Sequence, residues 1–347
     1  MLKFFQILLS PFVAVYYLII KVRNILFDAG IFKSEKVSTK IISVGNIVVG
    51  GAGKTPTVIY VLNILKKAGK KAGVLSRGYG RNSKGYKYVS DGEKFFTDVS
   101  ESGDEIYLAA NECGVAAAVS EKRVEGAKKF LDEQSLDAIV LDDAFQHRWI
   151  YRDIDILVFD QRFLNKVGKR VQNMLPLGVM REPFRSIARA NIVIINRKFS
   201  DKTELPKPLG KYFNNKKVFY GKYKATGLYD VKNHNSYSLK EFQGQRSLVI
   251  CGIARPYSFL NRLEQNKINI KNKILFPDHK EYTNKEVQLI RKKFYSTNAN
   301  SVLTTQKDAV KLTKFSKELD DIDIYYLKIE LEVENKEEFE KEIINIF

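Results

Sequence analysis

Residues 41–57 read IISVGNIVVGGAGKTPT, and this stretch decides the fold class that we predict for the chain. Its first part is an apolar run rich in β-branched residues, which is typical of a buried strand. The chain then turns through the glycine-rich segment Gly50–Thr55 and resumes a helical pattern from about Pro56. A strand, a glycine-rich turn and a helix in this order form the layout of a phosphate-binding P-loop.

The P-loop assignment predicts which residues contact a nucleotide triphosphate. Glycines allow successive backbone N–H groups to face an anion, and the N-terminus of the following helix adds a favourable dipole. Lys54 is expected to reach the β- and γ-phosphates, and the Thr55 hydroxyl to bind Mg²⁺. The usual pattern has a glycine where this chain has Val48, so a glycine-rich turn with an unrelated Lys-Thr pair is the alternative. The predicted ATP-binding residues are Val48, Gly50, Gly51, Ala52, Gly53, Lys54 and Thr55.

Length and composition limit the class of protein. A chain of 347 residues can hold two domains of ordinary size and a sizeable core. Its net charge of +18 indicates an anionic partner such as nucleic acid, anionic lipid or a phosphorylated substrate. We expect no nucleic-acid partner, because no basic stripe interleaved with aromatic residues and no binding module is recognisable. Cys113 and Cys251 lack metal-ligand spacing, which excludes zinc chemistry and favours a reducing compartment without disulfides.

The N-terminal segment is unusually apolar. Residues 2–20 (LKFFQILLSPFVAVYYLII) are almost uncharged and are followed by Lys21 and Arg23. About 19 residues is near the minimum that crosses a bilayer, and Pro11 is expected to kink or break a helix. A membrane-interface helix, a short single span and a helix buried on the protein all remain open. We favour a membrane-interface helix over residues 1–23, because its aromatic residues and flanking cations suit an anionic headgroup region.

After the P-loop, short apolar strands alternate with helical patterns as far as about residue 195. This alternation predicts an α/β fold with a mostly parallel sheet and helices on both faces. A hairpin is expected over Lys84–Phe96, and a polar segment near residues 198–217 marks a candidate domain boundary. A second strand–loop–helix unit begins at Ser247. Ligands are expected at the carboxyl ends of the parallel strands, where the polar loops fall.

Polar residues beyond the predicted strands are candidates for metal binding and proton transfer. Asp142 and Asp143 follow an apolar strand and are candidates to hold Mg²⁺ or its water shell. The alternative is that they form a turn or a helix cap. The P-loop elsewhere in the chain favours the metal role. His279 lies in a polar loop and could form a base–orienter pair with Asp104, whereas a hydrogen-bonded structural histidine is the alternative. The candidate phosphate clamps are Arg77, Arg81, Arg123 and Arg181.

Eight separate sequence blocks together resemble the tetraacyldisaccharide 4′-kinases, the lipid A 4′-kinases of Gram-negative bacteria. They occur in the family's order, cover most of the chain from about residue 1 to 315, and read VGNIVVGGAGKTP, LSRGYGR, SGDE, LDDAFQHR, LPLGVMREP, CGIARP, FPDHKEYT and TTQKDAVK. The family shares the departure at Val48. Ala144 stands where the family commonly has glycine, a change that concerns only the local turn.

The resemblance implies transfer of the ATP γ-phosphate to the 4′-hydroxyl of a tetraacylated glucosamine disaccharide 1-phosphate, which gives lipid IVA. It implies a P-loop kinase domain over residues 24–215, a short β linker over residues 216–240, and a smaller α/β domain over residues 241–347 that contributes the FPDH loop. The implied partners are ATP with Mg²⁺, an acylated disaccharide 1-phosphate lipid and an anionic membrane surface. The implied location is the cytoplasmic face of the bacterial inner membrane.

Carried over position by position, the resemblance assigns Mg²⁺ contacts to Thr55, Asp143 and Glu182, and a catalytic pair to Asp104 and His279. The implied substrate-binding residues are Arg77, Tyr79, Arg123, Asp142, Gln146 and His147. The predicted mechanism is direct in-line transfer, in which His279 takes the hydroxyl proton. Two other functions remain as alternatives. A membrane-associated P-loop ATPase or GTPase switch would not need His279, and a soluble small-molecule kinase or ligase would not need residues 1–23.

Overall fold

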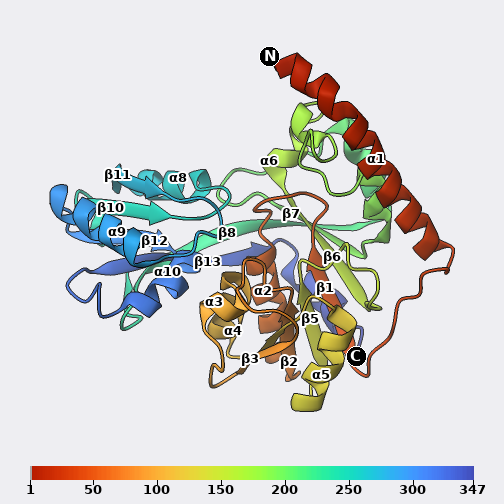
Figure 1. Cartoon of the computed structure of the whole chain (residues 1–347), viewed down its shortest axis with the longest axis horizontal. Helices are drawn as coiled ribbons and strands as arrows, with labels where there is room; N and C mark the ends of the chain where they lie inside the picture. Colours follow the sequence, from red (N-terminus) through yellow and green to blue (C-terminus); the bar gives the residue numbers. More distant parts are fainter. Residues whose placement is uncertain (1) are drawn as a thin grey trace.

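The computed structural model describes residues 2–347, with side chains from residue 9 onward, so Met1 and the first side chains of the predicted membrane segment lie outside the described part. The strands are β1 (Lys40–Gly45), β2 (Ala72–Ser76), β3 (Lys87–Asp91), β4 (Ala116–Val119), β5 (Ala138–Asp142), β6 (Ile154–Asp160), β7 (Ile192–Asn196), β8 (Lys217–Asp230), β9 (Ser236–Tyr237), β10 (Arg246–Cys251), β11 (Asn269–Leu275), β12 (Ser301–Thr305) and β13 (Ile324–Val333). They form one sheet in the order β11-β10-β12-β13-β8-β7-β6-β1-β5-β2-β4-β3, with β9 paired to β8 (Figure 1).

The helices cover both faces of this sheet. They are α1 (Leu2–Asp28), α2 (Lys54–Lys67), α3 (Val99–Ser102), α4 (Asp104–Cys113), α5 (Arg123–Glu133), α6 (Gln161–Leu164), α7 (Lys207–Phe213), α8 (Tyr257–Gln265), α9 (Asn284–Ser296), α10 (Gln306–Leu312) and α11 (Lys336–Ile344). Short 3₁₀ turns lie at Arg170–Gln172, Phe184–Arg189, Leu239–Phe242 and Thr313–Phe315.

We call the part built on β1–β7 the first lobe. Helices α2, α4 and α11 share one hydrophobic core with alternate residues of β1, β5 and β6, while α5, α6 and α7 pack in clusters on the opposite face. The strands are parallel except for β3, which pairs antiparallel with β4 at the edge. The predicted parallel sheet with helices on both faces is therefore confirmed. The hairpin expected over Lys84–Phe96 is only a short return, because β3 takes β4 as its partner and Phe95 forms a single bridge.

We call the part built on β10–β12 the second lobe. Adjacent residues of β10 face opposite sides: Val249 packs with α8, and Leu248 packs with α9 and α10. This alternation follows from the two-residue period of a strand that is buried on both faces. The lobe is therefore a second small α/β layer structure, as the strand–loop–helix unit after Ser247 predicted.

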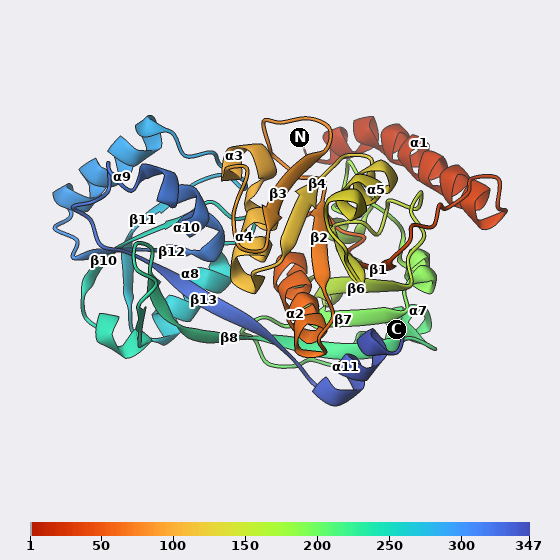
Figure 2. The ribbon, with the colours of Figure 1, turned by 90° about the horizontal axis from the view of Figure 1, so that it is seen from below.

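Two long strands join the lobes. The beginning of β8 runs parallel to β7, and β13 runs parallel to β12. Between these regions β8 and β13 pair antiparallel, from Asp230 with Tyr325 to Gly221 with Val333. Figure 2 shows this ribbon passing beneath both lobes. Strands β8 and β9 lie inside the range predicted as a β linker. Strand β13 comes from near the end of the chain, and its pairing with β8 was not predicted from the sequence.

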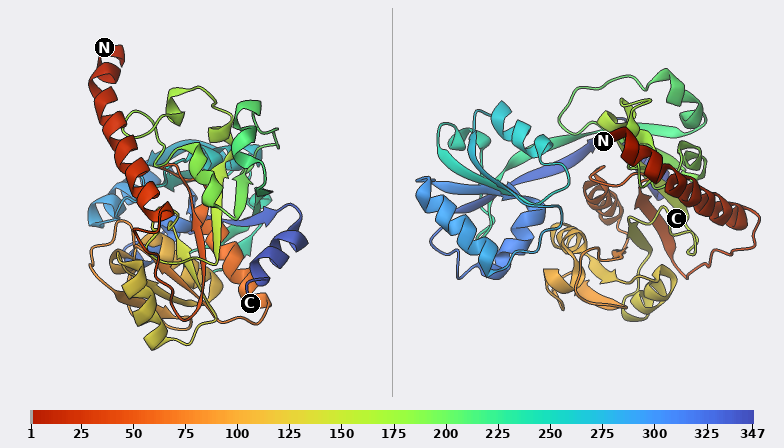
Figure 3. Two further views of the ribbon diagram at one scale, coloured as in Figure 1. Left: turned by 90° about the vertical axis from the view of Figure 1, so that its right-hand side faces the viewer. Right: turned by 45° about the horizontal axis from the view of Figure 1, so that its top comes forward.

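Helix α1 is continuous through Pro11, so the helix does not break at this residue. Pro11 is exposed and is the tenth residue of the helix, so α1 continues past it with one backbone N–H donor fewer. The helix also extends five residues past the predicted end at residue 23, to Asp28. Its N-terminal end projects away from the rest of the chain (Figure 3).

One face of α1 packs on the first lobe and the other carries apolar side chains. Val13, Tyr16 and Tyr17 pack against the core cluster that contains α6 and α7. The exposed stripe consists of Phe12, Val15, Leu18, Ile19, Val22 and Ile25. Within the described residues, the segment Leu9–Asp28 is the one helix long and apolar enough to cross a membrane. An apolar stripe at helical spacing on the outside of a helix is the reverse of what a solvent-facing surface requires.

Candidate active site

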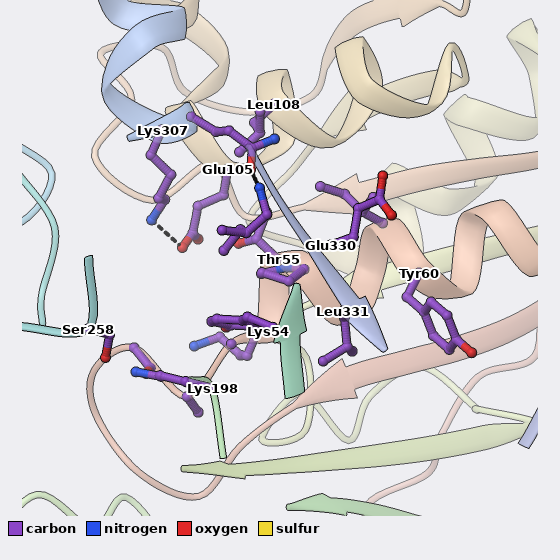
Figure 4. Close-up of a pocket in the computed structure, with 18 of the residues that line it drawn as sticks. Lys54, Thr55, Tyr60, Glu105, Leu108, Lys198, Ser258, Lys307, Glu330 and Leu331 are labelled. Carbon is purple, nitrogen blue, oxygen red and sulfur yellow. Dashed lines mark hydrogen bonds and ion pairs between the residues drawn. The ribbon is translucent and has the colours of Figure 1, made fainter. Parts of the chain in front are cut away.

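A cleft of about 1020 Å³ lies between the P-loop and the loops of the second lobe. The first lobe contributes residues 49–56, Tyr79, Glu105, Asp143 and Arg181, and the second lobe contributes Arg255, Asp278, His279 and Lys307. Figure 4 shows Lys54 and Thr55 at the floor of this cleft with Lys307 and Glu105 across from them. The cleft therefore opens at the carboxyl ends of β1, β5, β10 and β12, where an α/β sheet is expected to bind ligands.

The P-loop is held in place from the end of β7. Asn196 donates from Nδ2 to the Ala52 carbonyl at 3.2 Å, and Lys198 donates from Nζ to the Gly51 carbonyl at 2.9 Å. Gly53 has a φ of 101°, and a Cβ atom there would lie 2.2 Å from Asn196 Nδ2. Only glycine fits this position, both for its backbone and for its space. Val48, at the position where the usual pattern has glycine, is buried and forms a bridge with Met180 rather than facing the cleft.

Lys54 opens α2 and is paired across the cleft floor with Asp143. The distance from Lys54 Nζ to Asp143 Oδ1 is 3.6 Å, and Arg181 Nη1 lies 2.9 Å from Asp143 Oδ2. Burial alone would raise the pKa of Asp143, but Lys54 and Arg181 lower it below its ordinary value. Asp143 is therefore an anion held between two cations that can both reach a triphosphate.

Thr55 and Asp143 both line the cleft and offer oxygen ligands suited to Mg²⁺. No cluster of three or more His, Cys, Asp or Glu side chains able to hold a metal occurs among residues 9–347. This donor set fits Mg²⁺ that is shared with substrate phosphates, because such sites use one or two protein ligands and complete their shell with phosphate oxygens and water.

Glu182, the third residue assigned to Mg²⁺, lies behind the cleft wall and not in its lining. It is completely buried, and Arg189 Nη2 donates to both of its oxygens at 3.1 and 2.9 Å. Asn24 and Arg23 of α1 reach the same carboxylate at 3.0 and 3.4 Å. In this structure Glu182 therefore ties α1 to the segment that contains Arg181, and its metal role stays a prediction.

We expect Glu182→Gln to lower the free energy of unfolding by about 3 kcal/mol, since it leaves the half-buried Arg189 and Arg23 without the counter-charge of a fully buried carboxylate. Chemical denaturation in the absence of Mg²⁺ measures this change. Glu334→Gln is a matched control. Glu334 also pairs with two cations, Arg197 and Lys202, but its side chain is 36% exposed, so solvent screens the loss of its charge. Unchanged stability of Glu182→Gln together with a weaker response to Mg²⁺ would instead favour the metal role.

Asp104 and His279 meet at the cleft although they come from different lobes. Asp104 is the first residue of α4, His279 lies in the loop after β11, and Asp104 Oδ1 is 3.2 Å from His279 Nδ1. Tyr79 packs edge-on against the imidazole ring with ring centres 4.8 Å apart. The base–orienter pair that the sequence could not assemble is thus present as a contact.

The surroundings set the charge of both groups. Burial would raise the pKa of Asp104, but Lys307, the hydrogen bond with His279 and Lys311 hold it well below its usual range. Burial would lower the pKa of His279, but the hydrogen bond with Asp104 raises it above its ordinary value. Asp104 is therefore anionic at neutral pH and stabilises the protonated form of His279.

The implied substrate-binding residues form a group beside the cleft, of which Tyr79 alone is in the described lining. Arg123 is buried at the start of α5, where burial lowers its pKa to about 10. Asp142 is buried at the end of β5, and burial raises its pKa. Burial is the main cause that lowers the pKa of His147 to about 4, and repulsion from Arg123 and other nearby cations contributes to the same shift. Arg77 is exposed, and Gln146 donates to the Asn46 carbonyl at 2.8 Å.

The structure adds residues that the sequence reasoning did not assign. Asp160, at the end of β6, accepts from Lys198 Nζ at 3.1 Å and from Arg255 Nη1 at 2.8 Å, which links the first lobe to the loop after β10. Lys307 pairs with Glu105 at 2.8 Å across the lobes (Figure 4). Among the sequence signals for these residues were the position of Asp160 after an apolar strand and the blocks CGIARP and TTQKDAVK.

Known proteins share both the sequence and the shape of this chain. Relatives named tetraacyldisaccharide 4′-kinase include one from Chlorobaculum parvum, 34% identical over 98% of this chain and 94% of the relative, and one from Halothermothrix orenii, 32% identical over 95% and 89%. A crystal structure of LpxK from Aquifex aeolicus, described as an "apo" form in complex with ATP, matches 99% of both chains with a TM-score of 0.81 and 30% identity.

The profile of the family described as Tetraacyldisaccharide-1-P 4'-kinase matches residues 5–347, which includes the P-loop, both lobes and the Asp104–His279 contact. Because the match spans nearly the whole chain and the relatives agree with it, the chain belongs to the tetraacyldisaccharide-1-phosphate 4′-kinase family.

Proposed function

We propose that this chain transfers the γ-phosphate of ATP to the 4′-hydroxyl of a tetraacylated disaccharide 1-phosphate, which gives lipid IVA. Membership of the kinase family supports the reaction class, an ATP-dependent phosphotransfer to a hydroxyl group in lipid A biosynthesis. The observation that carries the proposal is the contact of Asp104 with His279 opposite the P-loop. A nucleotide switch needs the phosphate-binding half of this cleft but has no use for a positioned base.

The geometry supports direct in-line transfer. His279 Nδ1 faces Asp104, which leaves Nε2 free to take the proton of the attacking hydroxyl; the nearest carboxylate oxygen, Asp278 Oδ2, is 3.7 Å away. The new bond forms between that oxygen and the γ-phosphorus, and the bond to the bridging oxygen of ADP breaks. When ATP binds, Lys54 leaves its ion pair with Asp143 and contacts the β- and γ-phosphates. Bound by Thr55 and Asp143, Mg²⁺ would neutralise charge on the phosphates.

The test is ATP-dependent phosphorylation of detergent-dispersed tetraacyldisaccharide 1-phosphate by the purified full chain. We expect a lipid product that is heavier by one phosphate, formed only with Mg²⁺ and ATP. ATP hydrolysis without any lipid product would support the switch ATPase instead. Phosphorylation of a water-soluble acceptor in preference to the lipid would support the soluble kinase.

We further propose that the chain works at the inner membrane, on its cytoplasmic face, where ATP and an acylated substrate meet. The exposed apolar stripe of α1 supports this location. An excess of cations on the chain would add attraction to anionic headgroups.

We expect the double variant Val15→Glu and Ile19→Glu to bind anionic vesicles at least about 100-fold more weakly than the native chain. Each exposed side chain of this kind contributes roughly 1.5–3 kcal/mol when it leaves water, and glutamate adds repulsion from the headgroups. Vesicle co-sedimentation measures the effect, with ATP binding as the test of intact folding. Leu289→Glu is the control, since Leu289 is an exposed apolar residue on α9 in the second lobe. Equal binding by the double variant would contradict an interface role for α1.

A further inference from the structure

Helix α10 of the second lobe lies against the first turn of α4 in the first lobe. Lys307 and Lys311 are four residues apart and therefore share one face of α10. They meet two consecutive acidic residues: Lys307 Nζ is 2.8 Å from Glu105 Oε1, and Lys311 Nζ is 3.5 Å from Asp104 Oδ2. Lys307 lines the cleft, where it can contact a ligand. Lys311 is not part of the cleft lining and contacts Asp104 instead.

The two oxygens of Asp104 have different partners. Oδ1 contacts His279 Nδ1 at 3.2 Å, and Oδ2 contacts Lys311 Nζ at 3.5 Å. Asp104 is 6% exposed and the side chain of Lys311 is 9% exposed, so little solvent screens their interaction. A carboxylate with a partner on each oxygen cannot rotate about its last bond without losing one of them. The contact with Lys311 thus fixes the angle of the carboxylate plane, and with it the position of the oxygen that meets the imidazole.

Lys311 is itself fixed by a fully buried carboxylate. Its Nζ lies 3.0 Å from Asp308 Oδ1 and donates to the Lys280 carbonyl at 3.3 Å. Asp308 also accepts from Tyr282 Oη at 3.2 Å and from the Gly252 N–H at 2.9 Å. Lys280 and Tyr282 belong to the same loop as His279. Lys311 and Asp308 therefore hold both halves of the catalytic pair, Asp104 through its carboxylate and His279 through its loop.

We propose that Lys311 is a positioning residue that sets the geometry of the Asp104–His279 pair, and that Asp308 keeps Lys311 in place. This inference rests on the proposed function, in which His279 accepts the proton of the sugar hydroxyl. By fixing the angle of the Asp104 carboxylate, Lys311 keeps one oxygen in contact with His279 Nδ1, so that Nε2 is left for the substrate hydroxyl. It acts through Asp104 and does not contact substrate.

The charges around the pair determine what removal of Lys311 changes. Asp104 faces Lys311, Lys307 and His279, and is followed by Glu105; His279 also faces Asp278 and the ring of Tyr79. Without the Lys311 cation, Asp104 remains an anion at neutral pH because Lys307 and His279 are still present. Its negative charge is then less compensated, so protonated His279 becomes easier to form and the acid limb of the pH–rate profile moves to higher pH.

The experiment compares Lys311→Met, Lys311→Arg and the native full chain in the lipid phosphorylation assay. Methionine keeps the apolar length of the side chain and removes its charge, while arginine keeps the charge. For Lys311→Met we expect kcat to fall about 10- to 100-fold, part of the range assigned to a positioned general base, with KM for ATP within about twofold. The acid limb should move to higher pH in Lys311→Met and stay in place in Lys311→Arg, which should recover most of kcat. Lys314→Met is the matched control, because Lys314 lies three residues further on and its side chain is 60% exposed.

Each outcome decides the proposal. Activity of Lys311→Met within twofold of native would overturn it. A lower kcat with an unmoved acid limb, or with no recovery in Lys311→Arg, would also overturn it, since that pattern indicates loosened packing between α10 and α4. If the native chain makes no lipid product, the proposed function itself fails. That failure is distinct from loss of the Lys311 contact, because Lys311 is intact in the native chain.

Discussion

Lys54→Met is expected to lower kcat/KM for lipid phosphorylation by about 10³-fold or more, the scale observed when one cationic clamp is lost from phosphoryl transfer. Lys54 lines the cleft at the N-terminus of α2, and its side chain is mostly buried. Methionine fills similar space but cannot neutralise charge on the β- and γ-phosphates. It also leaves Asp143 with Arg181 as its one remaining ion pair, which adds repulsion between Asp143 and the triphosphate.

Steady-state kinetics with the dispersed lipid measures this loss, and denaturation controls for folding. Lys66→Met is a suitable control, because Lys66 lies at the other end of the same helix and its Nζ donates to the Cys113 carbonyl away from the cleft. Activity of Lys54→Met within tenfold of the native chain would contradict the assignment of Gly50–Thr55 as the phosphate-binding loop.

His279→Asn and Asp104→Asn are expected to lower kcat by about 10²- to 10⁴-fold while ATP binding persists, the range assigned to loss of a general base. Asparagine is the suitable replacement for His279, because the residue has a φ of 55° and asparagine tolerates that left-handed backbone. His234→Asn is the control: His234 has a φ of 59° and lies in the turn between β8 and β9. Equal rates for His279→Asn and the native chain would remove His279 as the proton acceptor.

The pH dependence gives a second, independent readout for the pair. Because His279 must be neutral to accept a proton, activity falls as pH drops through its pKa, which the hydrogen bond with Asp104 raises above the ordinary value. Asp104→Asn removes the anion that stabilises protonated His279, so the pKa of His279 falls. The acid limb of the remaining activity should move to lower pH, opposite in direction to the shift expected for Lys311→Met.

Much of the first lobe was predictable because its signals are local. The β-branched run before Gly50 and the helical pattern after Pro56 specified β1 and α2, and the alternation of short strands and helical patterns that follows specified the parallel sheet. The joining ribbon was not predictable to the same extent. Strand β13 lies about a hundred residues after β8 in the chain, and no pattern within either strand shows which partner it takes.

Function was predictable for a different reason, since eight separate blocks resembled one kinase family and the family match confirms that interpretation. The role of an individual site residue depends more on the groups that contact its side chain than on its residue type. Glu182 illustrates this: its block suggested a metal ligand, but Arg189, Asn24 and Arg23 occupy its carboxylate in this structure. Sequence spacing does not show which side of a loop is buried.

The sequence by itself determined the P-loop, the parallel α/β class, the apolar N-terminal helix and the family, because glycine positions and residue periodicity act within a few turns of chain. Only the tertiary structure decided that Asp104 and His279, 175 residues apart, are in contact. It also decided that Lys311 holds the other oxygen of Asp104 and that Glu182 anchors α1. These pairings arise where two lobes close on each other, and the energy of such contacts depends on burial and distance, which no local pattern encodes.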